Sequence, residues 1–162
     1  KFSMVLAVSS QTSFAAVVPQ EITCLATNIY WEARNQSKEG MIAVGSVTRN
    51  RVHAPHFPNN YCDVIYQAKL SKWWFENHQR EVPLRNKCQF SWYCDGKPDD
   101  IPNYDRELYE SIRRIATRIY FGYEKDNTYG SNFYHADYVH PLWADTMIYT
   151  VTIDDHIFYR SN

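Results

Sequence analysis

Residues 20–35 read "QEITCLATNIYWEARN", and the apolar residues in this stretch are spaced like one face of a helix. They recur at intervals of three and four residues, which is typical of a helix that packs against a core. The apolar positions are Ile22, Leu25, Ala26, Ile29, Tyr30 and Ala33. On a helical wheel Glu32 lies roughly 80° from the centre of this stripe, at the border between core and solvent. The pattern therefore predicts a helix that packs against a core and whose Glu32 carboxylate can enter a cleft.

The rest of the chain predicts two more amphipathic helices, followed by strands. Ser37 can cap a second helix, and Asp105 can cap a third that ends near Gly122. Their stripes are Met41, Val44 and Val47 with Arg51, and Leu108, Ile112, Ile115 and Ile119. "CDVIYQ" predicts a short helix, whereas the prolines spread through residues 76–104 predict a long irregular loop. "SNFYHADYV", "MIYTVTI" and "HIFYR" alternate like strands, so the predicted fold class is α+β, with a small C-terminal antiparallel β-sheet.

Length and composition fit one compact domain. The chain has 162 residues and a net charge of −1, and no run of Lys and Arg is present, so we expect no nucleic-acid partner. Aromatic residues make up 16% of the chain, with 13 Tyr and 5 Trp. Such side chains line sugar-binding sites, although a Tyr-rich core would have the same composition.

The N-terminal segment and the cysteines bear on the compartment. "KFSMVLAVSSQTSFAAVV" has a lysine before an apolar run and then small residues, so we expect residues 1–19 to be a signal-like or anchoring leader. The cysteines are Cys24, Cys62, Cys88 and Cys94. An even number fits two disulfides in an exported protein, but also four thiols in a cytosolic one. We expect at least one disulfide, with the pairing left open.

Two groups of side chains could carry chemistry. A carboxyl group beside apolar side chains is held toward its neutral form, so Glu32 could act as a general acid, as in glycosidases. From the residues alone, an ordinary helix glutamate that pairs with Arg34 is the better interpretation. The second group is His135, His140, His156 and Asp137. These could form a zinc site and hence an amidase, or they could be strand residues that bind backbone or substrate.

A third candidate is "CQFSWYCDG", residues 88–96. Gln89 and Ser91 alternate with Phe90 and Trp92, so the polar pair could bind amide or hydroxyl groups of a ligand. The segment could equally be a disulfide loop whose tryptophan fills the core. No GxSxG motif and no glycine-rich phosphate loop is present in the sequence.

Taken together, these segments resemble the cell-wall hydrolases of the SleB/CwlJ type, the spore-cortex-lytic enzymes and their relatives in bacteria and phages. The resemblance rests on "CLATNIYWEARNQSKEGMIAVGSVTRNRV", "FPNNYCDVIYQ", "CQFSWYCDG", "YHADYVHPLWA" and "HIFYR", in this order. It runs from about Glu21 to Arg160, and "IYWEAR" is its most distinctive block. The sequence differs from the family pattern at two segments. One is "GSNFYH", which contains Phe133, and the other is "IDDHIFYR", which has Asp154 and Asp155 where relatives often have Gly and Asn.

The resemblance implies a lytic transglycosylase of peptidoglycan with a lysozyme-like helical core, and it makes residues 20–162 the catalytic domain. The family's catalytic glutamate matches Glu32. We expect no metal and no organic cofactor. The residues expected to bind the sugars are Gln89, Ser91, Tyr134, His135 and His156, with Trp92 and Trp143 stacking on pyranose rings.

Several alternatives remain open on sequence. A hydrolytic muramidase would need a second carboxylate, with Asp95, Asp126 or Asp137 as candidates. A zinc amidase and a non-catalytic wall-binding module are the others. We expect peptidoglycan glycan strands as the partner, a monomer, and no stable membrane insertion apart from the leader. The enzyme would face the cell wall, either exported by a bacterium or released there by a phage.

Overall fold

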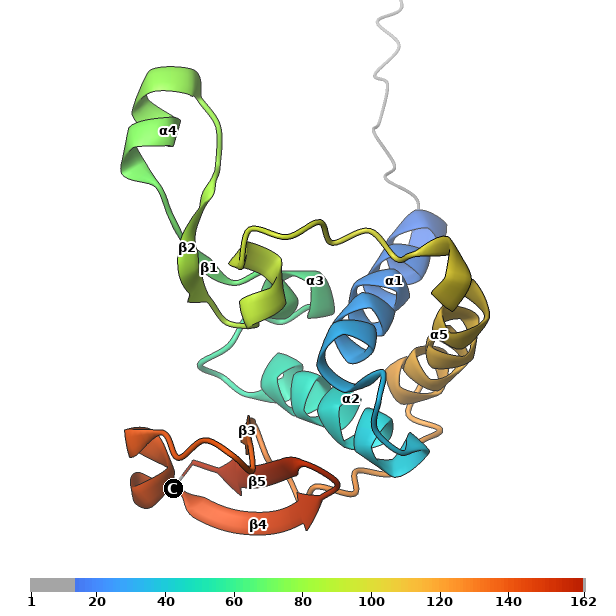
Figure 1. The fold of residues 1–162 in the computed structure, drawn as a ribbon. Coiled ribbons are helices and arrows are strands. Elements are labelled where there is room, and N and C mark those ends of the chain that lie inside the picture. Colours follow the sequence, from blue (N-terminus) through green and yellow to red (C-terminus); the bar gives the residue numbers. More distant parts are fainter. Residues whose placement is uncertain (1–13, 162) are drawn as a thin grey trace, which may run out of the picture.

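Three long helices form the body of the molecule in the computed structural model, which describes residues 14–161 (Figure 1). They are α1 (Phe14–Ala33), α2 (Lys38–His53) and α5 (Arg106–Tyr120). Helix α1 begins earlier than the apolar pattern predicts and contains Pro19. Residues 14–19 of the predicted leader are therefore the first turns of α1. The remainder of that leader lies outside the described residues.

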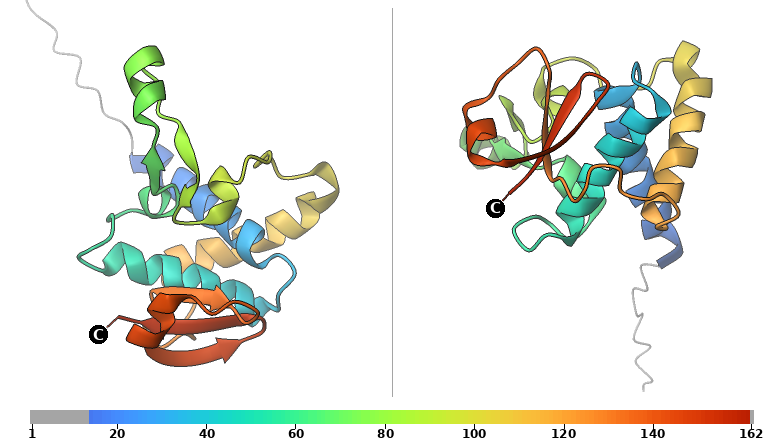
Figure 2. Two further views of the ribbon diagram at one scale, coloured as in Figure 1. Left: turned by 60° about the vertical axis from the view of Figure 1, so that its left-hand side comes forward. Right: turned by 90° about the horizontal axis from the view of Figure 1, so that it is seen from below.

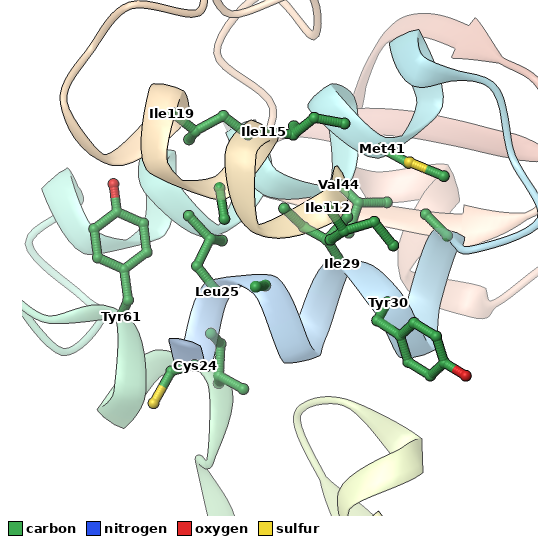
Figure 3. Close-up of a cluster of buried hydrophobic side chains, with 14 of the residues drawn as sticks. Cys24, Leu25, Ile29, Tyr30, Met41, Val44, Tyr61, Ile112, Ile115 and Ile119 are labelled. Carbon is green, nitrogen blue, oxygen red and sulfur yellow. The ribbon is translucent and has the colours of Figure 1, made fainter. Parts of the chain in front are cut away.

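The predicted apolar stripes meet in one core between these helices (Figure 3). Leu25 and Ile29 of α1, Val44 of α2, and Ile112 and Ile119 of α5 are fully buried. Complete burial of aliphatic side chains of this size contributes roughly 1.5–3 kcal/mol each. The core therefore fixes the orientation of α1, and with it the position of Glu32 in its last turn.

The helix ends agree in part with the predicted caps. The Ser37 hydroxyl is the N-cap of α2 and accepts a hydrogen bond from the Gly40 N–H at 3.1 Å. Asp105 precedes α5 but makes no side-chain cap, because its carboxylate instead accepts a hydrogen bond from the Tyr30 hydroxyl at 2.5 Å. Helix α5 ends before Gly122, which has a φ of 76° and so adopts the left-handed conformation that suits glycine.

The C-terminal strands form the predicted antiparallel sheet, which packs against α2 (Figure 2). The strands are β3 (Phe133–Ala136), β4 (Ile148–Ile153) and β5 (His156–Arg160), in the order β3-β5-β4. Phe158 in the central strand is fully buried against Ala43 and Val47 of α2. The α+β fold class is confirmed, with the sheet held on the face of α2 that turns away from α5.

The predicted irregular loop over residues 76–104 is wrong for its first part. The chain continues from α3 (Tyr61–Ile65) into β1 (Ala68–Leu70), α4 (Lys72–His78) and β2 (Pro83–Cys88), where β1 and β2 pair antiparallel. Two 3₁₀ turns follow, η1 (Ser91–Cys94) and η2 (Asn103–Asp105). Strand β2 has polar residues on both faces and is largely exposed, so it lacks the alternation that reveals a half-buried strand.

Two disulfides close loops of different size. Cys24 of α1 is joined to Cys62 of α3, 38 residues away, and Cys88 is joined to Cys94, six residues away. Glu21 reinforces the first link, because its carboxylate accepts a hydrogen bond from the Tyr61 N–H at 2.6 Å. The prediction of at least one disulfide is confirmed, and the pairing holds α3 on α1 and closes the loop around η1.

We expect the two disulfides to differ in their effect on stability. A cross-link stabilises mainly by restricting the unfolded chain, and the restriction grows with loop length. Replacing Cys24 and Cys62 by Ser should lower the free energy of unfolding by roughly 4 kcal/mol, and replacing Cys88 and Cys94 by Ser should lower it by roughly 2 kcal/mol. Urea denaturation of both variants provides the measurement. A larger loss for the short loop would contradict this account.

Candidate active site

A cleft of about 1020 Å³ opens where the end of α1 faces the η1 segment and the sheet. Arg51 of α2 and the 95–102 segment also contribute to its wall. The eight residues expected to form the site all line it: Glu32, Gln89, Ser91, Trp92, Tyr134, His135, Trp143 and His156. The structure thus brings together side chains from three separate parts of the sequence.

Glu32 lies in the last turn of α1 and meets a strand residue across the cleft. The Tyr134 hydroxyl donates a hydrogen bond to Glu32 Oε2 at 2.8 Å. Burial raises the pKa of Glu32 above its ordinary value, while this hydrogen bond and the charge of Arg51 act in the opposite direction with a smaller effect. A neutral carboxyl group in a cleft can donate a proton to a bound oxygen atom.

Tyr134 is held as a hydrogen-bond donor. Burial and the neighbouring Glu32 raise its pKa well above the ordinary value, so the phenol keeps its proton. Its ring packs against Phe158 and against the edge of His156, with centroids 5.5 and 5.1 Å away. The core of the sheet therefore determines where the hydroxyl points.

Arg51 lines the cleft, although the sequence did not single it out as functional. It is only 3% exposed, and its Nε donates to the Asn132 carbonyl at 2.7 Å. Three rings surround its guanidinium carbon at 5.2–5.6 Å: Phe57, Phe90 and Phe133. Its Nη1 is buried without a hydrogen-bond partner, and burial lowers its pKa to about 10, so it remains cationic at neutral pH. The sequence feature that could have identified Arg51 is its place in the apolar stripe of α2, where a charged residue is unusual.

The histidines do not form the zinc site that the sequence left open. His135 uses both ring nitrogens within the protein, with the Ala136 carbonyl at 2.8 Å and the Tyr159 hydroxyl at 3.1 Å. His140 is paired with Asp145 at 2.9 Å. Within residues 14–161 no three His, Cys, Asp or Glu side chains are grouped so that they could hold a metal ion.

His156 differs from His135 because one ring nitrogen is free. Its side chain is buried in the cleft wall, and Nδ1 has no hydrogen-bond partner. Burial lowers its pKa, which favours the neutral imidazole at neutral pH. His156 can therefore exchange a hydrogen bond with a ligand, whereas the nitrogens of His135 are already engaged.

Both interpretations of the "CQFSWYCDG" segment hold in part. Gln89 and Ser91 line the cleft and are exposed. Trp92 also lines it, but it is only 7% exposed, its Nε1 donates to Asn28 Oδ1 at 3.0 Å, and it stacks on Trp31. The disulfide loop thus fixes a buried tryptophan that places two polar side chains at the cleft.

The three candidates for a second carboxylate differ in whether they line the cleft. Asp95 lines the cleft, together with Asp99 and Asp100. Asp126 is outside the cleft lining and accepts hydrogen bonds from Thr128, Asn50 and Gly130. Asp137 is exposed and does not line the cleft. Of the three sequence candidates, only Asp95 lines the same cleft as Glu32.

Residues 35–159 match the model of a family described as cell wall hydrolase. The chain belongs to this family. Glu32 lies three residues before the matched range, so the match does not itself include that residue.

Individual relatives are consistent with the family and the fold. Over 62 residues the chain is 37% identical to the spore cortex-lytic enzyme of Bacillus subtilis, and this match covers 35% of the chain and 20% of the relative. The catalytic domain of the germination-specific lytic transglycosylase SleB from Bacillus anthracis has a similar fold, with a TM-score of 0.61 and 23% identity over 94% of this chain and all of that one. The catalytic domain of Bacillus cereus SleB gives a TM-score of 0.59 and 25% identity, covering 88% and 91% of the two chains.

These findings define the general setting of the protein. It belongs to the cell wall hydrolase family and has the fold of a SleB catalytic domain. Its two disulfides are consistent with a location outside the cytoplasm. Among the helices of residues 14–161, none has the length and apolar character needed to span a bilayer.

The partly buried carboxyl group of Glu32 should reduce the stability of the native state at neutral pH. Because folding raises the pKa of Glu32, the native state loses stability as pH rises from about 4 through the folded pKa. Glu32→Gln has no ionisation to penalise, so it should melt at a higher temperature than wild type at pH 7, and the difference should vanish near pH 4. Thermal melts across this range test the prediction.

Glu110→Gln is the matched control, because Glu110 is an exposed glutamate on α5. It should change the melting temperature little at any pH. The prediction is contradicted if Glu32→Gln is destabilising at pH 7, or if its stabilisation persists unchanged at pH 4.

Proposed function

We propose that this cell wall hydrolase is a lytic transglycosylase that cleaves the β-1,4 bond between N-acetylmuramic acid and N-acetylglucosamine. The observation that carries the proposal is the half-buried Glu32 carboxyl group, which lines a large cleft and has a raised pKa and a tyrosine hydrogen-bond donor. The fold similarity to a domain described as a lytic transglycosylase supports it. We assign the activity to residues 20–162.

In the first step Glu32 acts as the general acid. Tyr134 occupies Oε2, so Oε1 is free to carry the proton toward the bridging oxygen. Transfer of that proton to the oxygen accompanies cleavage of its bond to C1 of the muramoyl residue, and the N-acetylglucosamine chain leaves with a new 4-hydroxyl group. Glu32 is then a carboxylate beside an oxocarbenium-like centre.

In the second step the same carboxylate acts as the base. It takes the proton from the C6 hydroxyl of the muramoyl residue while the C6 oxygen closes on C1, which gives a 1,6-anhydromuramic end and restores neutral Glu32. The nucleophile belongs to the substrate, so its high effective concentration favours it over water. The steps use one carboxyl group and no metal or organic cofactor.

The neighbours of Glu32 fit the carboxylate that forms between the two steps. The Tyr134 hydroxyl can strengthen its hydrogen bond to a charged acceptor, and the Arg51 charge stabilises the same state. Arg51 Nη1 and His156 Nδ1 are buried without partners, and with Gln89 and Ser91 they can bind the acetamido and hydroxyl oxygens of the sugars. All these residues come from one chain, so we propose that a monomer is sufficient.

A hydrolytic muramidase is the second candidate, because Asp95 lies in the cleft lining. In that mechanism a second carboxylate would activate water to attack C1, and the product would have an ordinary reducing end. The position of Asp95 in the same cleft makes it the residue to test.

Mass spectrometry of fragments released from purified peptidoglycan distinguishes the two mechanisms. We expect wild type to release muramic ends that are lighter by one water than reducing ends, and Glu32→Gln to release fewer by at least about a thousandfold. Asp95→Asn should retain activity within about tenfold if water activation is not needed. Reducing ends that disappear in Asp95→Asn would instead establish the muramidase.

Two further outcomes would reject this account of Glu32. Free stem peptides would indicate an amidase. Binding of peptidoglycan without cleavage by either wild type or Glu32→Gln would indicate a wall-binding module.

Removing the Tyr134 hydroxyl should move the pH dependence of cleavage. The hydrogen bond from Tyr134 lowers the pKa of Glu32, so Tyr134→Phe should raise that pKa further. Activity that requires protonated Glu32 would then fall at a higher pH than in wild type, while the maximal rate drops because the carboxylate intermediate loses its donor. The measurement is kcat/KM against pH on soluble glycan fragments.

Tyr123→Phe is the control, since Tyr123 is 70% exposed and lies outside the cleft lining. It should leave the profile unchanged. An alkaline limb that stays in place or moves to lower pH in Tyr134→Phe would contradict the role of this hydrogen bond.

A further inference from the structure

The segment from β1 through α4 to β2, residues 68–88, projects from the helical body as a hairpin with α4 at its far end (Figures 1 and 2). We call it the β1–β2 hairpin. None of the residues of α4 is buried. No residue of the hairpin before Cys88 lines the cleft, so its shape is not explained by the proposed catalytic site.

Large apolar side chains of the hairpin are exposed to solvent. Trp73 is 58% exposed, Phe75 51%, Leu70 47% and Leu84 41%. The aromatic residues at positions 73, 74 and 75 follow one another at about 100° around the short helix, so they cover more than one side of the tip. Their ring contacts are local, between Trp73, Trp74 and His78. An exposed apolar cluster of this kind marks a surface that meets an apolar partner.

The charge of the hairpin differs in sign from that of the rest of the chain. Its exposed cationic residues are Lys69, Lys72, Arg80, Arg85 and Lys87. With Glu76 and Glu81 the hairpin has a net charge of +3, while the whole chain has −1, so the remainder carries −4. Glu76 is already paired with Lys72 at 3.5 Å. The hairpin therefore suits an anionic partner.

We propose that the β1–β2 hairpin binds the anionic surface of a phospholipid bilayer. Tryptophan inserts at the level of the headgroups, where its apolar ring and its polar N–H are both satisfied, and phenylalanine beside it buries an apolar ring. Lysine and arginine beside them gain from the negative surface potential. Arg80 lies over the Trp74 ring at 5.8 Å, so this cation and an aromatic side chain already share one site.

A bilayer fits the hairpin better than a glycan strand. Sugar sites present flat rings inside a groove, together with polar side chains that bind hydroxyl groups. The hairpin instead presents a convex tip with aliphatic Leu70 and Leu84 next to its aromatic residues. Such a contact would leave the cleft free, and would keep the enzyme at the membrane while it acts on the adjacent wall.

The test is cosedimentation of the whole chain with vesicles. Vesicles of equal parts phosphatidylglycerol and phosphatidylcholine should bind wild type, and vesicles of phosphatidylcholine alone should bind it much less. Trp73→Ala/Phe75→Ala should weaken binding to the anionic vesicles by at least about tenfold. Lys69→Glu/Lys72→Glu should weaken it at least as much, and added salt should weaken binding of wild type.

Phe121→Ala/Tyr123→Ala is the matched control, because these exposed aromatic residues follow α5 and are not part of the hairpin. It should bind vesicles like wild type, and circular dichroism should show that all variants are folded. The proposal is overturned if wild type does not bind anionic vesicles, or if the control loses binding equally. It is also overturned if the hairpin variants keep lipid binding and lose binding to isolated peptidoglycan, which would make the hairpin a wall-binding surface. None of these outcomes depends on the reaction at Glu32.

Discussion

The hydrogen bond between Tyr134 and Glu32 connects the two layers of the molecule. It joins the last turn of α1 to β3 across 102 residues of sequence. A distance of 2.8 Å leaves little freedom, so the sheet must sit at a fixed height above the end of α1. Helix α2 provides that spacing, because it packs on α1 with Val44 and on the sheet with Ala43 and Val47. The three-helix core and the small sheet thus together fix the position of the Glu32 carboxyl group.

A second connection fixes the far edge of the sheet. In the turn between β4 and β5, the Asp154 carboxylate accepts hydrogen bonds from the Ser37 N–H and hydroxyl at 2.9 and 2.6 Å. Gln36 donates to Asp155 at 3.0 Å. The two aspartates tie this turn to the beginning of α2, and their contacts hold the sheet, and hence Tyr134, in place.

The elements that the sequence predicted correctly are those with one buried face. The stripes of α1, α2 and α5 were visible because each helix has one face in the core, and the C-terminal strands were visible because one side of the sheet is covered by α2. Strand β2 was missed because its fold depends on pairing with β1, and its side chains are exposed on both faces. The cleft residues could be named through the resemblance, but their contacts could not. Periodicity does not show that His135 is fully engaged while His156 has a free nitrogen, or that Arg51 reaches the cleft from within an apolar stripe.

The groups around Glu32 act on its proton in opposite directions, and the proposed chemistry requires both. A residue that is first an acid and then a base must be able to exist in either state at the same pH. Burial alone would favour the neutral acid so strongly that the carboxylate would form at a high cost. Arg51 alone would keep it ionised and remove the acid. The Arg51 guanidinium is itself desolvated, since it lies among aromatic rings, and it donates a hydrogen bond to the Asn132 carbonyl. Tyr134 donates to only one oxygen of Glu32. Burial therefore remains the larger effect at rest, while both partners are already in position when the proton leaves.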